Sequence, residues 1–154
     1  GGVLYDLNVY NLSLIAALFG RPQSAVYTAN IGFNGIDTSG VMTLRYNGFV
    51  ATAAAAKDSS SPSFFMIQGE SGWIRADGPP NELTSFTVGL RGREEKTYAL
   101  NRHAHRMVHE FEAMRDIFAR KDYMSVEEGL QISRMVIALM EKARLVAGIQ
   151  FRVD

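Results

Sequence analysis

The 154-residue chain contains no cysteine. This absence excludes disulfides, thiolate metal sites and thiol nucleophiles, and it agrees with a reducing compartment such as the cytoplasm. The chain also lacks an excess of either charge, because Lys plus Arg and Asp plus Glu both number 16. No net electrostatic field attracts nucleic acid or an anionic membrane, so neither is expected as a partner.

Long apolar runs are missing as well. The longest ones fall far short of the about 20 residues that a membrane span requires, and no basic segment followed by an apolar one marks a signal peptide. We therefore expect a cytoplasmic protein. The length suffices for one hydrophobic core, and no repeat or linker divides the sequence. Residues 1–154 are expected to form a single domain.

A dinucleotide-binding fingerprint is absent too. No Gly-x-Gly-x-x-Gly follows a predicted strand, no helix start is suited to cradling phosphate, and no acid is placed to hold a ribose. We therefore expect neither a Rossmann domain nor bound NAD or NADP in this chain.

What is present is a helix followed by strands. Apolar residues recur near a helical period over 4–19, and Gly20 followed by Pro22 gives a stop signal. Alternating polarity then predicts strands, with hairpin turns at Asn47-Gly48 and at Gly69 to Gly72. The small side chains of one of these strands predict close packing by another element. The strands are expected over residues 24–33, 41–46, 49–56, 64–68, 84–90 and 96–100, with a loop over 57–63 that looks flexible.

After residue 101 the period becomes helical. A helix is predicted over about 103–121, and Ser125 with Glu128 forms a capping box for a second helix that Gly148 ends. A short strand is expected over 149–153. The sequence therefore predicts an α+β fold with an open-faced, predominantly antiparallel (mixed) sheet of about six strands, and with helices packed on one face.

Two polar residues of the first predicted helix are candidates for chemistry. Asp6 and Tyr10 are four residues apart, which places them on one face of a regular helix. An acid near a helix start is often only favoured by the helix dipole, and a tyrosine there is often a half-buried amphipathic residue. The residue types alone leave both interpretations open.

The histidines suggest a metal site that we do not expect. His105, His109 and the neighbouring Glu110 lie close in sequence, together with His103. Their order is not His-Glu-x-x-His, and the sequence identifies no matching third ligand. A solvated helix start is the simpler interpretation, and no metal is predicted. The serines of residues 59–61 likewise lack a His and Asp partner set.

Several segments in order resemble one family. The opening GGVLYDLNVYNLSLIAALFGRP, the hairpin IQGESGWI, the helix HRMVHEFEAM and the closing VAGIQF are similar to the C-terminal domain of the glucose-fructose oxidoreductase, inositol dehydrogenase and MocA-type (Gfo/Idh/MocA) family of NAD(P)-dependent oxidoreductases. In that family a glycine-rich turn leads into a helix with an Asp, a His or Tyr four residues later, and a Phe-Gly-x-Pro-like stop. The resemblance covers nearly the whole chain.

The resemblance implies an enzyme of two domains with separate roles. In this family an N-terminal Rossmann domain binds NAD or NADP and supplies a lysine, while the C-terminal domain supplies the open-faced sheet, much of the substrate pocket and usually a subunit interface. The chain would then be the substrate-binding and oligomerisation domain of an oxidoreductase for a sugar, polyol or related hydroxyl compound. It would lack the N-terminal cofactor domain, be inactive alone, and form a homodimer through its sheet. The alternative is a non-catalytic binding or dimerisation module.

The resemblance also assigns roles to residues. Tyr10 stands at the position of the catalytic His or Tyr, where it would exchange a proton with a substrate hydroxyl; because a phenol has an ordinary pKa of about 10, a nearby cation is required. Asp6 matches the family's acid and would orient the substrate or Tyr10. Asn8 stands where a glycine is common, and Lys57 lies near strand ends that line the pocket. Both are candidates for substrate binding.

Overall fold

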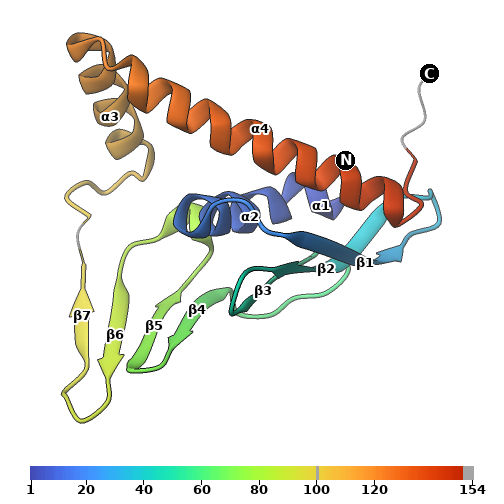
Figure 1. Ribbon diagram of the computed structural model, residues 1–154, viewed down its shortest axis with the longest axis horizontal. Coiled ribbons are helices and arrows are strands. Elements are labelled where there is room, and N and C mark those ends of the chain that lie inside the picture. The colour runs from blue at the N-terminus through green and yellow to red at the C-terminus, as the bar shows by residue number, and fades with distance from the viewer. Residues whose placement is uncertain (100, 151–154) are drawn as a thin grey trace. The chain divides into compact units, whose positions relative to one another are not determined.

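The structure is a computed structural model that describes residues 1–99 and 101–150. The chain divides into two compact units (Figure 1). The first unit comprises Gly1–Ser60 and the chain from Met124 onward, and the second comprises Ser61–Tyr123. No helix in the described part of the chain is both long and apolar enough to cross a bilayer.

The first unit is a three-stranded antiparallel sheet with helices over one face (Figure 1). Its strand order is β1-β2-β3, with Ser24 opposite Arg45 and Arg45 opposite Val50. The turn between the second and third strands contains Gly48, whose φ of 88° suits glycine. The elements are α1 (Val3–Asp6), α2 (Asn8–Phe19), β1 (Ser24–Ile31), β2 (Asp37–Arg45), β3 (Val50–Ala56) and α4 (Tyr123–Val146).

The core of this unit lies between the sheet and its helices. Alternate strand residues point into it, as the period of two requires, and α4 contributes positions spaced three and four apart. The alanines of β3 leave room for α2 to approach closely, which confirms the packing expected from small side chains. The buried cluster consists of Leu4, Leu12, Ala16, Tyr27, Met42, Leu44, Tyr46, Ala53, Val136, Met140, Ala143 and Ile149.

The second unit holds a four-stranded antiparallel sheet of order β4-β5-β6-β7. The first hairpin turns tightly, with Gly69 opposite Gly72, as the glycine spacing predicted. Trp73 lies opposite Gly89, where a Cβ would overlap the indole. The elements are β4 (Phe64–Gly69), β5 (Gly72–Asp77), the 3₁₀ turn η1 (Pro80–Glu82), β6 (Phe86–Leu90), β7 (Lys96–Tyr98) and α3 (Met107–Arg120).

The predicted α+β class and the antiparallel pairing are confirmed. The strands differ from the expectation in forming two sheets of three and four strands instead of one sheet of about six. Both sheets are antiparallel, so the described residues contain no Rossmann domain. Ile149 and Gln150 are not in a strand, and the remainder of the terminal strand predicted over 149–153 lies outside the described residues.

Candidate functional site

A buried carboxylate anchors the N-terminal turn. Asp37 is only 3% exposed, and it accepts hydrogen bonds from the backbone N–H of Leu4 at 2.7 Å and from the Tyr27 hydroxyl at 2.8 Å. Burial, and next the bond to Asp37, raise the pKa of Tyr27, so this hydroxyl remains a donor. A Cβ on Gly2 would overlap the Asp37 carboxylate. Glycine is therefore required where the chain enters α1.

The helix predicted over 4–19 is interrupted. Its first part ends at Asp6, and the second starts at Asn8 after Leu7, whose φ and ψ are −113° and −44°. The Tyr10 N–H reaches only three residues back, to the Leu7 carbonyl at 3.3 Å. Asp6 and Tyr10 thus belong to two short helices, which corrects the assumption that they share a regular helix face.

Asp6 forms an ion pair with Lys57. The distance between Lys57 Nζ and Asp6 Oδ2 is 2.5 Å, and Nζ also donates to the Gly1 carbonyl at 3.1 Å. The backbone N–H of Lys57 donates to the Thr38 carbonyl at 2.8 Å, which fixes the residue directly after β3. The hydrogen bond from Lys57 and its charge lower the pKa of the Asp6 carboxyl. The structure thus brings together two of the predicted site residues.

Tyr10 lies in the first turn of α2 and is 46% exposed. Its side chain therefore reaches solvent at the end of α2 that follows Asp6. Asp6 and Lys57 are also accessible, with side chains 59% and 37% exposed. The three side chains belong to the same unit and are all open to a small molecule.

Asn8 occupies a different environment, because it is 0% exposed. Its Nδ2 donates to the Ala53 carbonyl at 3.1 Å, and its Oδ1 accepts from Asn11 Nδ2 at 2.8 Å. Asn11 in turn donates to the Ala54 carbonyl at 3.1 Å. The amide pair holds α2 against β3. This corrects the expectation that Asn8 contacts substrate, because its side chain is enclosed by protein.

Asp58 is a site residue that the sequence did not indicate. Its Oδ2 accepts hydrogen bonds from Thr38 Oγ1 at 2.6 Å, Ser39 Oγ at 2.9 Å and Asn30 Nδ2 at 3.0 Å. These bonds lower the pKa of Asp58 to about 2. They tie the start of the loop after β3 to β1 and β2, so Lys57 is held at a defined place. A serine-rich loop indicated flexibility, and no sequence signal marked its first acid as a pairing residue.

The second unit contains a hollow of about 490 Å³ beside its sheet. Its lining comes from residues 66–95 and includes none of the candidate catalytic or binding residues predicted from the sequence. Two of its arginines are already engaged: Arg75 pairs with Asp77 at 2.8 Å, and Arg91 donates to the Glu70 carbonyl at 3.1 Å. The prominent lining residues are Met66, Gln68, Trp73, Arg75, Leu90 and Arg91.

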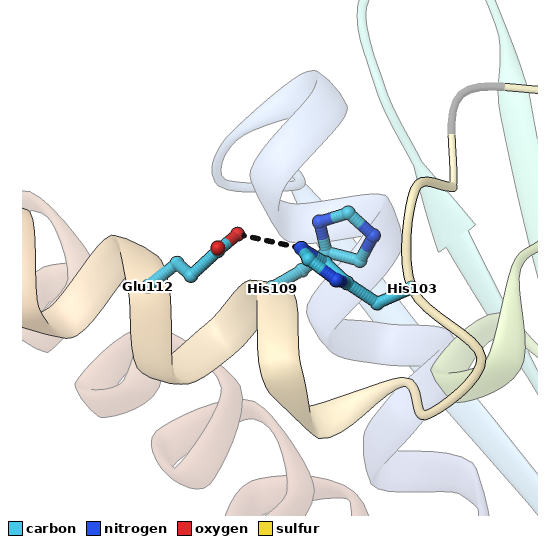
Figure 2. Close-up of side chains that lie close together, drawn as sticks. All are labelled: His103, His109 and Glu112. Atoms are coloured by element: carbon cyan, nitrogen blue, oxygen red, sulfur yellow. Dashed lines mark hydrogen bonds and ion pairs between the residues drawn. The ribbon is translucent and has the colours of Figure 1, made fainter.

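Two histidines and a glutamate meet at the start of α3 (Figure 2). His103 Nε2 lies 3.1 Å from Glu112 Oε2, and the His103 and His109 rings meet edge to face with centroids 4.8 Å apart. One ligand atom from each of the three residues lies within 4.8 Å of the others. His105 is not a member of this group; its Nδ1 accepts from the Met107 N–H at 3.3 Å. These are the residues in the described part of the chain that could hold a metal.

Comparisons with known proteins support the resemblance seen in the sequence. Residues 1–75 match the model of the GFO/IDH/MocA C-terminal domain. Over 153 residues the chain is 28% identical to scyllo-inositol 2-dehydrogenase (NADP⁺) of Bacillus subtilis (strain 168), covering 99% of this chain and 46% of that protein. The chain thus spans about half the length of this curated relative.

Solved structures share the fold. The aldose-aldose oxidoreductase from Caulobacter crescentus, complexed with glycerol, superposes with a TM-score of 0.68 at 19% identity, over 95% of this chain and 46% of that one. A 3-ketoreductase from Actinomadura kijaniata, in complex with TDP-benzene and NADP, gives a TM-score of 0.68 at 16% identity, over 90% of this chain and 46% of that one. The resemblance recognised in the sequence is thus confirmed: residues 1–75 are similar to the C-terminal domain of the Gfo/Idh/MocA oxidoreductases, and the chain shares its fold with solved oxidoreductase structures.

Proposed function

We propose that this chain is the substrate-binding and dimerisation domain of an NAD(P)-dependent oxidoreductase that acts on a sugar, a polyol or a related hydroxyl compound. The observation that carries the proposal is the Asp6–Lys57 ion pair at 2.5 Å. Asp6 lies four residues before Tyr10, whose side chain is also accessible. An accessible acid, cation and phenol are the groups needed to hold a hydroxyl compound and to exchange its proton.

The proposed chemistry is oxidation of an alcohol carbon or its reverse. A nicotinamide held outside this chain would accept the hydride from that carbon. Tyr10 exchanges the hydroxyl proton as the general acid or base. Lys57 is a cation that this chain itself supplies, and Asp6 fixes the direction of its ammonium group. Lys57 and Asp6 are accessible enough to hydrogen-bond the substrate hydroxyls as well.

The relatives support this substrate class and cofactor. They are an inositol dehydrogenase named for NADP⁺, an aldose-aldose oxidoreductase complexed with glycerol, and a 3-ketoreductase in complex with NADP. All three act on, or are complexed with, compounds that carry hydroxyl or keto groups. We extend this to a hydroxylated substrate for the present protein, with NAD or NADP bound outside this chain.

The proposal is tested in the protein that the whole gene encodes. Tyr10→Phe removes only the hydroxyl, and kcat for oxidation of inositols or aldoses is expected to fall by about 10²- to 10⁴-fold because the proton acceptor is lost. The matched control is Tyr123→Phe, since Tyr123 is 74% exposed in another segment. An unchanged kcat in the Tyr10 variant would contradict the catalytic role.

The alternative is a non-catalytic dimerisation module. The face of the three-stranded sheet opposite its helices favours this reading, because Val26, Val41 and Val50 are exposed there by 61%, 44% and 60%. An apolar face of this kind suits a second copy of the same sheet. A gene that encodes no cofactor domain beside this chain would support the module and contradict the enzyme.

A further inference from the structure

The loop before α3 and the first turns of α3 bring three metal-ligating side chains together. His109 and Glu112 are three residues apart on α3, which places them on the same side of the helix, and His103 comes from the preceding loop (Figure 2). All three are half-buried. We propose that His103, His109 and Glu112 form a binding site for a divalent transition metal of the zinc type.

The donor set fits this class of ion. Imidazole nitrogen suits zinc, copper and nickel, whereas magnesium and calcium prefer oxygen ligands throughout. Two histidines and one glutamate are also a set that zinc uses with a water molecule as its fourth ligand. The ligand types of this site therefore favour zinc over magnesium and calcium.

The distances also suit a tetrahedral ion. Zinc bonds of about 2.0–2.2 Å place neighbouring ligand atoms about 3.3 Å apart. The His103 Nε2 to Glu112 Oε2 distance of 3.1 Å already agrees with this, and no ligand atom is farther than 4.8 Å from another. To reach the tetrahedral spacing, the most distant pair of ligand atoms has to approach by about 1.5 Å at most.

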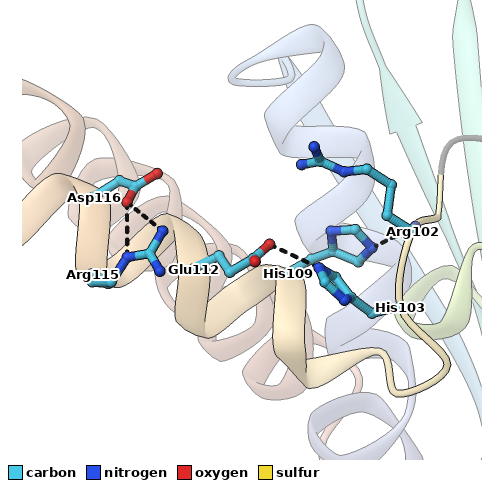
Figure 3. A network of polar contacts seen from close by, with 6 residues as sticks. All are labelled: Arg102, His103, His109, Glu112, Arg115 and Asp116. Carbon is cyan, nitrogen blue, oxygen red and sulfur yellow. Dashed lines mark hydrogen bonds and ion pairs between the residues drawn. The ribbon is translucent and has the colours of Figure 1, made fainter.

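Two arginines of this segment are already engaged by carboxylates. Arg115 Nη2 pairs with Asp116 at 2.9 Å (Figure 3), and Arg106 pairs with Glu82 at 2.7 Å. The partner of Glu112 is His103 and not an arginine, so a metal bound between them would replace the hydrogen that bridges His103 Nε2 and Glu112 Oε2.

Metal binding has a consequence for the loop. The Arg102 backbone N–H donates to His109 Nε2 at 3.2 Å, and a neutral imidazole has one lone pair to offer. A metal on Nε2 takes that lone pair, and a metal on Nδ1 moves the ring proton to Nε2. Either way the Arg102 N–H loses His109 Nε2 as its acceptor. The ion thus ties the loop to α3.

The test is calorimetric titration of the full chain with zinc chloride, with magnesium chloride as the comparison ion. One zinc per chain is expected, together with a higher melting temperature in zinc. His103→Ala and Glu112→Gln should each weaken zinc binding by at least about 10-fold, since even residues that only support ligands are worth that much. The Arg102 amide resonance should shift on zinc addition.

Two matched controls separate this site from adventitious binding. His105→Ala and Glu110→Gln alter the same residue types in the same segment, at positions outside the cluster. They should bind zinc as the parent does. Absence of saturable binding, or equal weakening in the His105 and His103 variants, would overturn the proposal. Circular dichroism of each variant establishes that the fold is retained.

Discussion

Asn8 illustrates at the residue level how a polar side chain can be fully buried without being left unpaired. It is 0% exposed, yet its amide bonds both the Ala53 carbonyl and Asn11. The resemblance to the family placed this residue beside substrate because only its sequence position was known. Its partners lie 45 residues away on β3, and no local pattern could reveal them.

Asn8→Ala should therefore destabilise the protein. Loss of the amide leaves the buried Ala53 carbonyl without this partner, and the free energy of unfolding is expected to fall by about 1–3 kcal/mol in urea titrations. Asn81→Ala, at an exposed position of η1, should change it by less than about 0.5 kcal/mol. Equal stability of the Asn8 variant and the parent would show that the amide pair does not join α2 to β3.

The two N-terminal glycines give a second comparison. A Cβ on Gly2 would overlap Asp37, whereas one on Gly1 has nothing within 4 Å. Gly2→Ala is expected to lower the free energy of unfolding by about 1–3 kcal/mol through overpacking. Gly1→Ala should have no measurable effect. Similar denaturation midpoints for the two variants would contradict the close approach of α1 to β2.

At the level of elements, the end of β3 depends on a carboxylate. Asp58 joins β1, β2 and the loop through three hydrogen bonds, and its pKa is about 2 instead of the ordinary 3.8. A lowered pKa means that the folded state binds this proton less well than the unfolded state. The stability from Asp58 is thus present above about pH 4 and is lost as the pH falls toward 2.

Asp58→Asn should flatten this dependence. The midpoint of urea unfolding, measured from about pH 6 to about pH 2, is expected to fall less steeply in the variant than in the parent. Some slope should remain, because hydrogen bonds from Arg144 and Tyr5 lower the pKa of Glu141 to about 2 as well. Identical slopes for parent and variant would exclude Asp58 as a source of acid sensitivity.

The break in the predicted first helix is also decided by contacts between elements. Periodicity predicted one helix over 4–19, and the structure contains two, because Leu7 interrupts the regular hydrogen bonds. The turn entering α1 is held by Asp37 from a neighbouring strand. Such a bond lies outside any sequence window, which is why amphipathic spacing found the helical region and missed the break.

At the scale of the whole molecule, the fold leads to a prediction about cofactor binding by this chain alone. Both sheets of the described residues are antiparallel and lack the strand-turn-helix unit that holds a dinucleotide. Titration of the chain with NADH or NADPH should give no calorimetric or fluorescence signal. Tight binding would contradict the proposal that the cofactor is held elsewhere.

The exposed face of the three-stranded sheet leads to a prediction about assembly. Val26, Val41 and Val50 lie on that face, and we expect a homodimer by light scattering because burial of apolar area drives association. Val41→Lys should shift the equilibrium toward monomer. Val126→Lys on α4 is the matched control, since both valines are 44% exposed. A strict monomer at high concentration would contradict dimerisation through this face.

The sequence by itself determined the secondary-structure classes, the antiparallel hairpins and the resemblance to one family. These follow from periods of two and 3.6 residues, from turn glycines, and from a motif of contiguous residues, all of which are local properties. It also placed Asp6, Tyr10 and Lys57 among the residues of interest, on the basis of their position in the family's segments.

Only the tertiary structure decided which of these residues meet. It paired Asp6 with Lys57, enclosed Asn8, and brought His103 to His109 and Glu112. It also divided the strands between two sheets. Each of these results depends on contacts between residues that are distant in the chain or on an irregular loop, and the physical cause is that side-chain partners are chosen by packing in three dimensions.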